Sequence, residues 1–348
     1  MRRGGRSIIW MAAGLGLTAL GPACVRSGDT DARRPVDTLT LGAYSVVREA
    51  FHDGILPAFA ARWEQETGRA VRFEESYNGS GAQARAIASG FDADVAVLSL
   101  EGDMDLLVKA GMVRPDPAGK PTWRMVTRSL VVIGHREGNP KAIRDWSDLT
   151  RPGVGVLYPD PKTSGGARWN IAAIWGAGLL GGPGRAPDPD AARDLLAGVQ
   201  ANVVNMDGSG RQSLATFERG TGDAVVTYEN ELLLRRKFGA RPIPYATPDA
   251  TLQIESPAAL VGPSIDRHGN RAVAEAFFGF LLSAEGQAIL ADYGFRPVDP
   301  GVRGAGNSPR PSRLFTIRDL GGWPAVKKTV FDDGGVWAST FTRRAGGR

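Results

Sequence analysis

The chain has 348 residues, of which 42% are hydrophobic and 23% are charged, a size and composition that suit a globular protein with two lobes of ordinary domain size. Lys and Arg outnumber Asp and Glu by five over the whole chain, yet residues 24–300 hold 30 basic and 34 acidic residues. A nucleic-acid-binding protein carries its positive charge on the folded domain, so this distribution argues against that class.

Residues 1–23 have the layout of an export signal. Three arginines within the first six residues precede an apolar run over residues 8–20, and small residues follow at 21–23. Cys24, the single cysteine of the chain, comes next, in a position that resembles a bacterial lipoprotein cleavage site. We expect a signal peptide over 1–23, a lipid anchor at Cys24 and a polar linker over 24–37. A retained membrane anchor and an ordinary cleavage nearby are the alternatives.

Strands and helices alternate in the first part of the mature chain. A strand is predicted to start at 39–41, and a helix rich in Ala, Phe and Trp is predicted to end near Gly68. Further strands are expected at 70–73 and 94–98, followed by a helix through residues 106–107. Such alternation is typical of parallel α/β layers.

The same alternation resumes in the second part of the chain, where Gly/Pro-rich loops at 181–190 and 300–313 separate the elements. The chain shows no repeat at a fixed period, so the two lobes are inferred from this pattern alone. The elements predicted here are strands at 130–133, 154–157 and 224–227, and helices at about 165–181, 190–199, 211–219 and from residue 272 onward.

Three segments place a serine beside a glycine just before a predicted helix: residues 79–81, 163–166 and 208–210. The first N–H groups of a helix have no partner within the helix and carry partial positive charge. Serine can cap one of these groups, and glycine lets an anion approach the others. Each segment alone is typical of an ordinary helix cap. Three such helix starts converging on one cleft would form an anion site without Lys or Arg side chains.

Signals for catalysis, cofactors or metals are weak. No glycine-rich segment ends like a Walker A loop or matches a dinucleotide fingerprint, and the histidines lack metal-ligand spacing. Asp223, Glu229 and Glu231 could form an acid–base group, although acidic residues are also typical of a helix N-terminus. Arg168 and Arg211 lie just inside two predicted helices and are interpreted as ion-pair partners, or else as a long-range field for an anion. We predict no catalytic residue, no cofactor and no metal.

Several segments follow one another in an order that is specific to a known family. Residues 160–170 read DPKTSGGARWN and residues 77–83 read YNGSGAQ. Matching stretches continue at 139–149, at 222–231 and within 315–335. Together these segments resemble the bacterial sulfate- and thiosulfate-binding proteins of ABC importers, which are periplasmic solute-binding proteins.

The resemblance implies an α/β, two-lobed periplasmic-binding-protein fold of type II, with the ligand in the cleft between the lobes. One lobe is then expected to contain residues 38–124 and, after the chain returns, residues 256–300. The other lobe is expected over 125–255, and residues 301–348 are expected to form a C-terminal extension that packs on the lobes.

The resemblance also implies a set of groups around the anion. Relatives usually have Asp at position 45 and Trp at position 228, where this chain has Ser45 and Tyr228. A backbone donor survives the first change, but tyrosine can both donate and accept. The second change therefore predicts a less strict distinction between sulfate and hydrogen phosphate. The expected ligands are the backbone N–H groups of Ser45, Ser80, Gly165, Gly166 and Gly210, the hydroxyl of Ser164 and the side chain of Tyr228.

A shell made of donors favours one kind of anion. Sulfate is fully ionised near neutral pH and only accepts hydrogen bonds, whereas hydrogen phosphate carries a proton that such a shell leaves unpaired. No carboxylate lies within the three serine–glycine segments, although Asp207 adjoins one of them.

The predicted protein is an exported, monomeric, non-enzymatic binding component that captures sulfate or thiosulfate and delivers it to ABC transporter permease subunits. It is expected in the periplasm or at the cell surface. Two alternatives stay open: a binding protein for another oxyanion such as phosphate or molybdate, and an exported enzyme or sensor module on the same fold.

Overall fold

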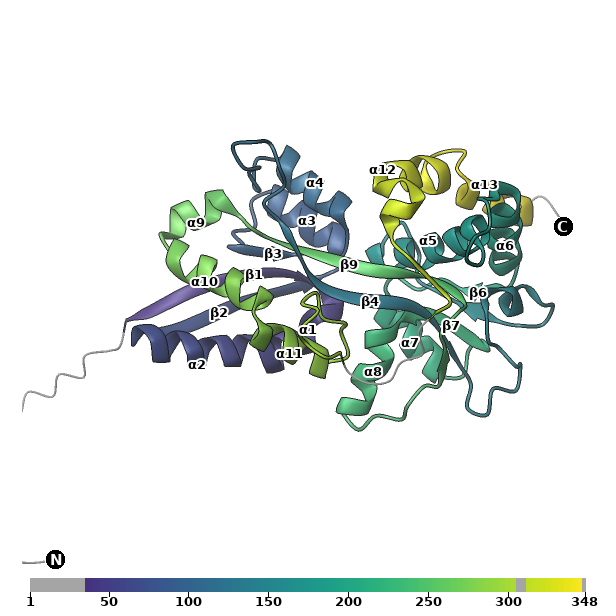
Figure 1. The fold of residues 1–348 in the computed structure, drawn as a ribbon, viewed down its shortest axis with the longest axis horizontal. Coiled ribbons are helices and arrows are strands. Elements are labelled where there is room, and N and C mark those ends of the chain that lie inside the picture. The colour runs from purple at the N-terminus through teal and green to yellow at the C-terminus, as the bar shows by residue number, and fades with distance from the viewer. Residues whose placement is uncertain (1–34, 305–310, 346–348) are drawn as a thin grey trace, which may run out of the picture. The chain divides into compact units, whose positions relative to one another are not determined.

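The computed structural model describes residues 35–304 and 311–345, which form one mixed β-sheet with helices on both faces (Figure 1). The predicted signal peptide, Cys24 and most of the predicted linker lie outside the described residues. The first strand begins at Val36, so the last two residues of the expected linker belong to it. Asp37 already belongs to the folded part, because its carboxylate accepts hydrogen bonds from Trp63 Nε1 at 2.9 Å and Arg69 Nη2 at 2.7 Å.

The strands run in the order β2-β1-β3-β9-β4-β7-β5-β6, with β10 paired to β9 and β8 paired to β4. Pairing is parallel within the β2-β1-β3 and β7-β5-β6 groups, and antiparallel where β9 meets β3 and β4 and where β4 meets β7. The strands are β1 Val36–Tyr44, β2 Ala70–Asn78, β3 Val95–Val97, β4 Arg124–His135, β5 Val156–Leu157, β6 Val203–Asn205, β7 Ala224–Tyr228, β8 Tyr245–Ala246, β9 Ala250–Leu260 and β10 Arg313–Phe315.

Every predicted helix and strand occurs, with boundaries shifted by a few residues. The expected parallel layers occur in the groups β2-β1-β3 and β7-β5-β6. Between them the chain crosses the sheet on β4 and returns on β9, and these strands pair antiparallel because they run in opposite directions. The α-helices are α1 Arg48–Ala50, α2 Leu56–Thr67, α3 Ser80–Ala88, α4 Glu101–Lys109, α5 Gly165–Leu180, α6 Pro189–Ala201, α7 Gly210–Glu218, α8 Glu229–Lys237, α9 Gly262–His268, α10 Arg271–Leu282, α11 Ala284–Asp292, α12 Gly322–Val326 and α13 Val336–Ala345.

No single helix of the described chain is long and apolar enough to cross a membrane; the pair α10 and α11, bent by 62° at their junction, meets that criterion only when taken together.

The first half of the sheet has a hydrophobic core on each face. Strand side chains alternate between the two faces, and Val95 and Val97 of β3 pack in one core while Ala96 packs in the other. Helices α2, α10 and α11 close the first core, and α3 and α4 close the second. These layers build the first lobe.

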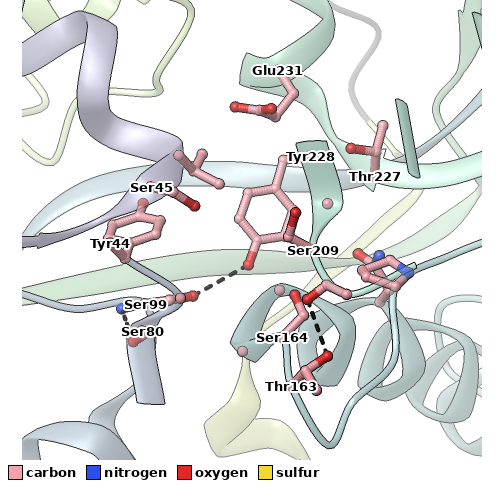
Figure 2. A pocket seen from close by; sticks show the side chains of 18 residues that line it. Tyr44, Ser45, Ser80, Ser99, Thr163, Ser164, Ser209, Thr227, Tyr228 and Glu231 are labelled. Atoms are coloured by element: carbon pink, nitrogen blue, oxygen red, sulfur yellow. Dashed lines mark hydrogen bonds between the residues drawn. The ribbon is translucent and has the colours of Figure 1, made fainter. Parts of the chain in front are cut away.

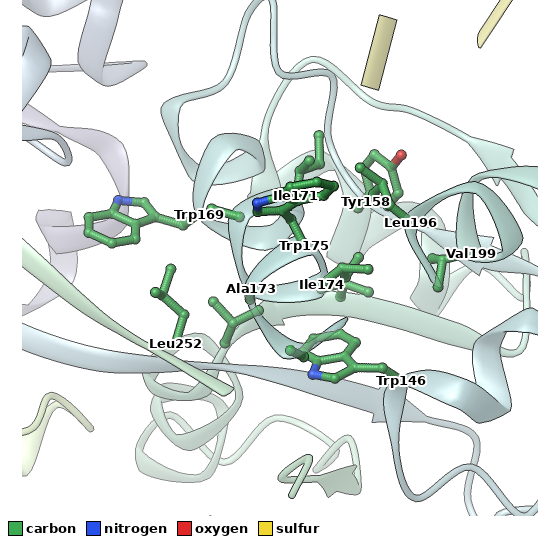
Figure 3. Packing of buried hydrophobic residues seen from close by; sticks show 14 of the residues in the cluster. Trp146, Tyr158, Trp169, Ile171, Ala173, Ile174, Trp175, Leu196, Val199 and Leu252 are labelled. Atoms are coloured by element: carbon green, nitrogen blue, oxygen red, sulfur yellow. The ribbon is translucent and has the colours of Figure 1, made fainter. Parts of the chain in front are cut away.

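The core of the second lobe is built around α5, which is buried nearly all round (Figure 3). Such a helix must pack against neighbours on every side. Trp169 and Ile174 of α5 share this core with Phe315 and Trp323 from the C-terminal segment. A methyl group at Gly176 would overlap the Phe315 ring, so glycine at this position admits the close approach.

Strands β4 and β9 pass through both lobes (Figure 1). Val126 of β4 and Ala258 of β9 lie in a first-lobe core, whereas Ile133 of β4 and Leu252 of β9 lie in the second-lobe core. The two lobes are therefore joined by paired strands, and each lobe combines segments that are distant in sequence.

Candidate functional site

A cavity of about 40 Å³ lies where the two lobes meet (Figure 2). Its walls come from segments that follow the carboxyl ends of strands in both lobes, the usual place for a ligand in an open α/β sheet. All seven residues predicted as ligands line it: Ser45, Ser80, Ser164, Gly165, Gly166, Gly210 and Tyr228.

Three helix N-termini converge on the cavity, and they are the helix starts predicted from the serine–glycine segments. Helix α3 starts at Ser80, α5 at Gly165 and α7 at Gly210. A fourth turn, the 3₁₀ segment Ser45–Val47, starts at its edge. The unpaired N–H groups and the positive ends of these turns make the cavity suitable for an anion.

The three serines do not all act as helix caps. Ser209 caps α7, because its hydroxyl accepts from the N–H of Gln212 at 3.3 Å. Ser164 makes no such bond to the start of α5. Ser80 is the first residue of α3, and its hydroxyl donates to Asp103 Oδ2 at 2.5 Å. The cap predicted for every segment is thus confirmed for one of them, and Ser164 lines the cavity with its hydroxyl free of a capping role.

Ser99, which the sequence analysis missed, connects the walls of the cavity. Its backbone N–H donates to Ser80 Oγ at 2.8 Å, and its hydroxyl lies 3.3 Å from the hydroxyl of Tyr228. Trp169 Nε1 donates to the Ser99 carbonyl at 2.9 Å and lies 3.2 Å from the Ser99 hydroxyl. Ser99 stands two residues after β3, and that position near the end of a strand was the signal available in the sequence.

Tyr228 ends β7 and is 4% exposed. Burial, with the nearby Tyr44 and Glu231 adding to it, raises the pKa of the Tyr228 phenol well above its usual value. The side chain therefore enters the cavity as a neutral phenol, and Figure 2 shows its hydroxyl directed toward Ser99.

An ion-pair network beside the cavity joins the two lobes. Arg211 of α7 pairs through both terminal nitrogens with Glu49 of α1, one contact being 2.6 Å, and lies 3.3 Å from Glu231 of α8. Burial alone would lower the pKa of Arg211, but the carboxylates of Glu231 and Glu49 raise it. For Glu49 the hydrogen bond and charge of Arg211 outweigh burial and lower its pKa.

Glu231 is the one carboxylate among the cavity-lining residues that the structure describes. Burial raises the pKa of Glu231, and the charge of Arg211 opposes this only in part. The sequence analysis assigned Glu229 and Glu231 to a helix N-terminus, which is confirmed by their place in the first turn of α8. Glu229 is held by Arg296 at 2.7 Å, and Asp223 accepts from the N–H of Gly155 at 2.8 Å, so the three carboxylates form no common group.

The two arginines inside the helix starts behave differently. The ion-pair prediction is confirmed for Arg211. Arg168 makes no ion pair in the described part of the chain: it donates to the carbonyl of Pro161 at 3.2 Å and lies over the Phe331 ring. The charge of Arg168 still acts at a distance, since it lowers the pKa of Asp103 against the larger raising effect of burial.

Known proteins resemble this chain over most of its length. Residues 53–296 match the family described as bacterial extracellular solute-binding protein. The sulfate-binding protein of Synechococcus elongatus is 40% identical over 90% of this chain and 89% of its own. The thiosulfate-binding protein of Pseudomonas aeruginosa is 34% identical over 86% of this chain and 91% of its own.

A solved structure agrees with these sequence relatives. The sulfate-binding protein SubI of Mycobacterium tuberculosis superposes with a TM-score of 0.74 at 39% identity, covering 85% of this chain and all of that one. Its fold confirms the expected two-lobed architecture. The chain therefore belongs to the bacterial extracellular solute-binding proteins, and within them to the group of the sulfate- and thiosulfate-binding proteins.

Proposed function

We propose that this protein captures sulfate or thiosulfate outside the cytoplasm and delivers it to the permease subunits of an ABC importer, without catalysing a reaction. The observation that carries the proposal is the convergence of three helix N-termini on one cavity between two lobes. Such an arrangement binds an anion through fixed dipoles. The relatives named for sulfate and thiosulfate support the choice of anion.

The proposed shell consists mostly of donors. Backbone N–H groups would come from the first residues of the four turns, and hydroxyl groups from Ser164 and Tyr228. Glu231 is the exception among the lining residues, and its carboxylate is occupied by Arg211. Since a fully ionised oxyanion only accepts hydrogen bonds, it leaves no donor of this shell without a partner.

The lobes touch around the cavity, which supports a closed state that encloses the ligand. A methyl group at Gly165 would lie 3.3 Å from the Ser80 side chain, and one at Gly79 would lie 3.4 Å from the carbonyl of Thr163. Contacts this close leave too little room for an anion to pass between the lobes. We infer that the lobes separate about β4 and β9 when the anion enters or leaves.

The proposal extends to organisation and location. We propose one lobe over 38–124 and 256–300, the other over 125–255, and a C-terminal extension from 301, which fits the packing of Phe315 and Trp323 in the second-lobe core. We further propose export by a signal over 1–23, anchoring through a lipid, and action as a monomer.

Calorimetric titration with sulfate, thiosulfate, molybdate and hydrogen phosphate tests the proposal. We expect sulfate or thiosulfate to bind most tightly, with neither anion chemically altered afterwards. Tighter binding of molybdate or hydrogen phosphate would favour the alternative oxyanion receptor. Turnover of any of the four anions would favour an enzyme, and the lack of binding to all of them would refute an oxyanion receptor.

A further inference from the structure

We propose that Ser99 sets the hydrogen-bond direction of Tyr228, so that the two hydroxyls together donate one hydrogen bond to the bound anion. Ser99 is then a positioning residue that preserves selection against protonated oxyanions even though the cavity holds a tyrosine, which can accept as well as donate. This inference rests on the proposed function, because it concerns the same cavity.

The position of Ser99 is held from both lobes. Its N–H donates to Ser80 Oγ in the first lobe at 2.8 Å, and its carbonyl accepts from Trp169 Nε1 in the second lobe at 2.9 Å. Ser80 is itself fixed, since its hydroxyl donates to Asp103. The side chain of Ser99 is 1% exposed, so no bulk water competes for its hydroxyl.

The indole of Trp169 determines what the Ser99 hydroxyl can do. An indole N–H only donates, so at 3.2 Å from Trp169 Nε1 the Ser99 oxygen is an acceptor and its own proton is available for another partner. The hydroxyl of Tyr228, at 3.3 Å, is that partner among the described contacts of Ser99 Oγ.

The two hydroxyls have two protons and share one hydrogen bond. When Ser99 donates to Tyr228, the phenol proton turns to the cavity that both residues line. Because the Ser99 oxygen already accepts from Trp169, Ser99 is the donor to Tyr228, and the pair presents the phenol O–H to the anion. The raised pKa of Tyr228 keeps the phenol protonated, so this donor persists across neutral pH.

This arrangement changes the selectivity expected from the sequence. A Tyr228 hydroxyl that is free to rotate could accept a hydrogen bond from a protonated anion. When Ser99 donates to it, the phenol proton points into the cavity instead, and it would meet the O–H of that anion with no acceptor between them. A buried donor left without an acceptor is costly. Hydrogen phosphate should therefore be rejected about as strictly as by an indole at this position.

The test compares sulfate and hydrogen phosphate affinities, measured by calorimetry at one pH, for the wild type and four variants: Ser99→Ala, Tyr228→Phe, their double mutant and Ser264→Ala. Ser264 is a buried serine of α9 that does not line the cavity, which makes it the matched control. We expect Ser99→Ala to leave sulfate binding within about twofold, because the phenol can still donate to the anion. Hydrogen phosphate should bind about tenfold more tightly, because the freed phenol can accept from its O–H, so the ratio of sulfate to phosphate affinity falls.

The double mutant separates action through Tyr228 from a general structural effect. With Tyr228→Phe already present, Ser99→Ala should change the sulfate-to-phosphate affinity ratio by less than about twofold, because Ser99 acts on selectivity through the phenol. Equal losses for both anions in Ser99→Ala, or full additivity in the double mutant, would overturn the proposal. A wild type that binds neither sulfate nor thiosulfate would instead refute the proposed function.

Tyr228→Trp provides an independent test if Ser99→Ala folds poorly. Because a paired Tyr228 acts as a donor only, Tyr228→Trp should leave the sulfate-to-phosphate affinity ratio within about twofold of wild type. A rise of tenfold or more in that ratio would show that Tyr228 accepts from protonated anions, and the proposal would fail.

Discussion

Ser164 and Ser209 show how one residue type serves two purposes at the same kind of position. Both precede a helix that starts at the cavity, yet Ser209 caps its helix with its side chain and Ser164 does not. The Ser164 hydroxyl is therefore available to a ligand, while the Ser209 hydroxyl satisfies a backbone N–H that would otherwise lack a partner.

Ser164→Ala should weaken sulfate binding by about ten- to hundredfold, because a hydrogen bond to a charged group contributes roughly 1.5–3 kcal/mol. The melting temperature of the ligand-free protein should stay unchanged. Ser209→Ala is the matched control and should lower the free energy of unfolding by about 1 kcal/mol through the lost cap. Calorimetry and thermal melts measure both effects, and an unchanged dissociation constant for Ser164→Ala would exclude its hydroxyl from the shell.

At the scale of elements, α1 and α7 are linked across the cleft by Glu49 and Arg211. Both side chains are about one third exposed or less, at 26% and 33%, so water screens the pair only in part. Because α7 also starts at the cavity with Gly210, holding α7 against α1 holds one wall of the site closed.

Glu49→Gln should weaken anion binding near neutral pH by about tenfold, mainly through faster dissociation, since the cross-lobe pair exists only when the lobes are closed. The pKa of Glu49 is lowered in the folded protein. The pair therefore contributes fully above the unfolded pKa of a glutamate and is lost as the pH falls through the lowered value. Stopped-flow dissociation rates should differ between wild type and Glu49→Gln at neutral pH and converge in acid.

Asp92→Asn is the control for this experiment. Asp92 pairs with Arg267 within the first lobe, and both side chains are about half exposed, so the loss of that pair should leave dissociation unchanged. If Asp92→Asn and Glu49→Gln accelerate dissociation equally, the effect comes from charge alone and not from the link between α1 and α7.

At the scale of the whole molecule, the sequence predicts that a lipid anchors the protein to a membrane. Cys24 follows the apolar run and the small residues at 21–23, and a lipid on this cysteine would place the binding lobes beside the membrane that carries the permease. Cys24→Ser should shift the protein from the membrane fraction to the soluble exported fraction and remove the mass of the lipid. Continued membrane association with unchanged processing would contradict a lipid anchor.

Much of the fold could be predicted because its elements are encoded locally. Helix α2 ends at Gly68, whose φ of 70° suits glycine, and the apolar run of α5 marks a buried helix. Strand β9 escaped prediction, since it includes Pro257, which cannot donate in a ladder. The pairing of β4 and β9 shifts register between Met125 and Thr127, beside that proline. The strand pairing that joins the two lobes could therefore not be predicted from the local sequence pattern.

The sequence by itself determined the three helix starts at the cavity, because a serine, a glycine and a following helix-forming segment are neighbours in the chain. Only the tertiary structure decided what surrounds them. Ser99 and Tyr228 are 129 residues apart, and Glu49 and Arg211 are 162 apart. Contacts over such separations depend on which strands pair and how the lobes close, and no spacing of residues along the chain encodes either.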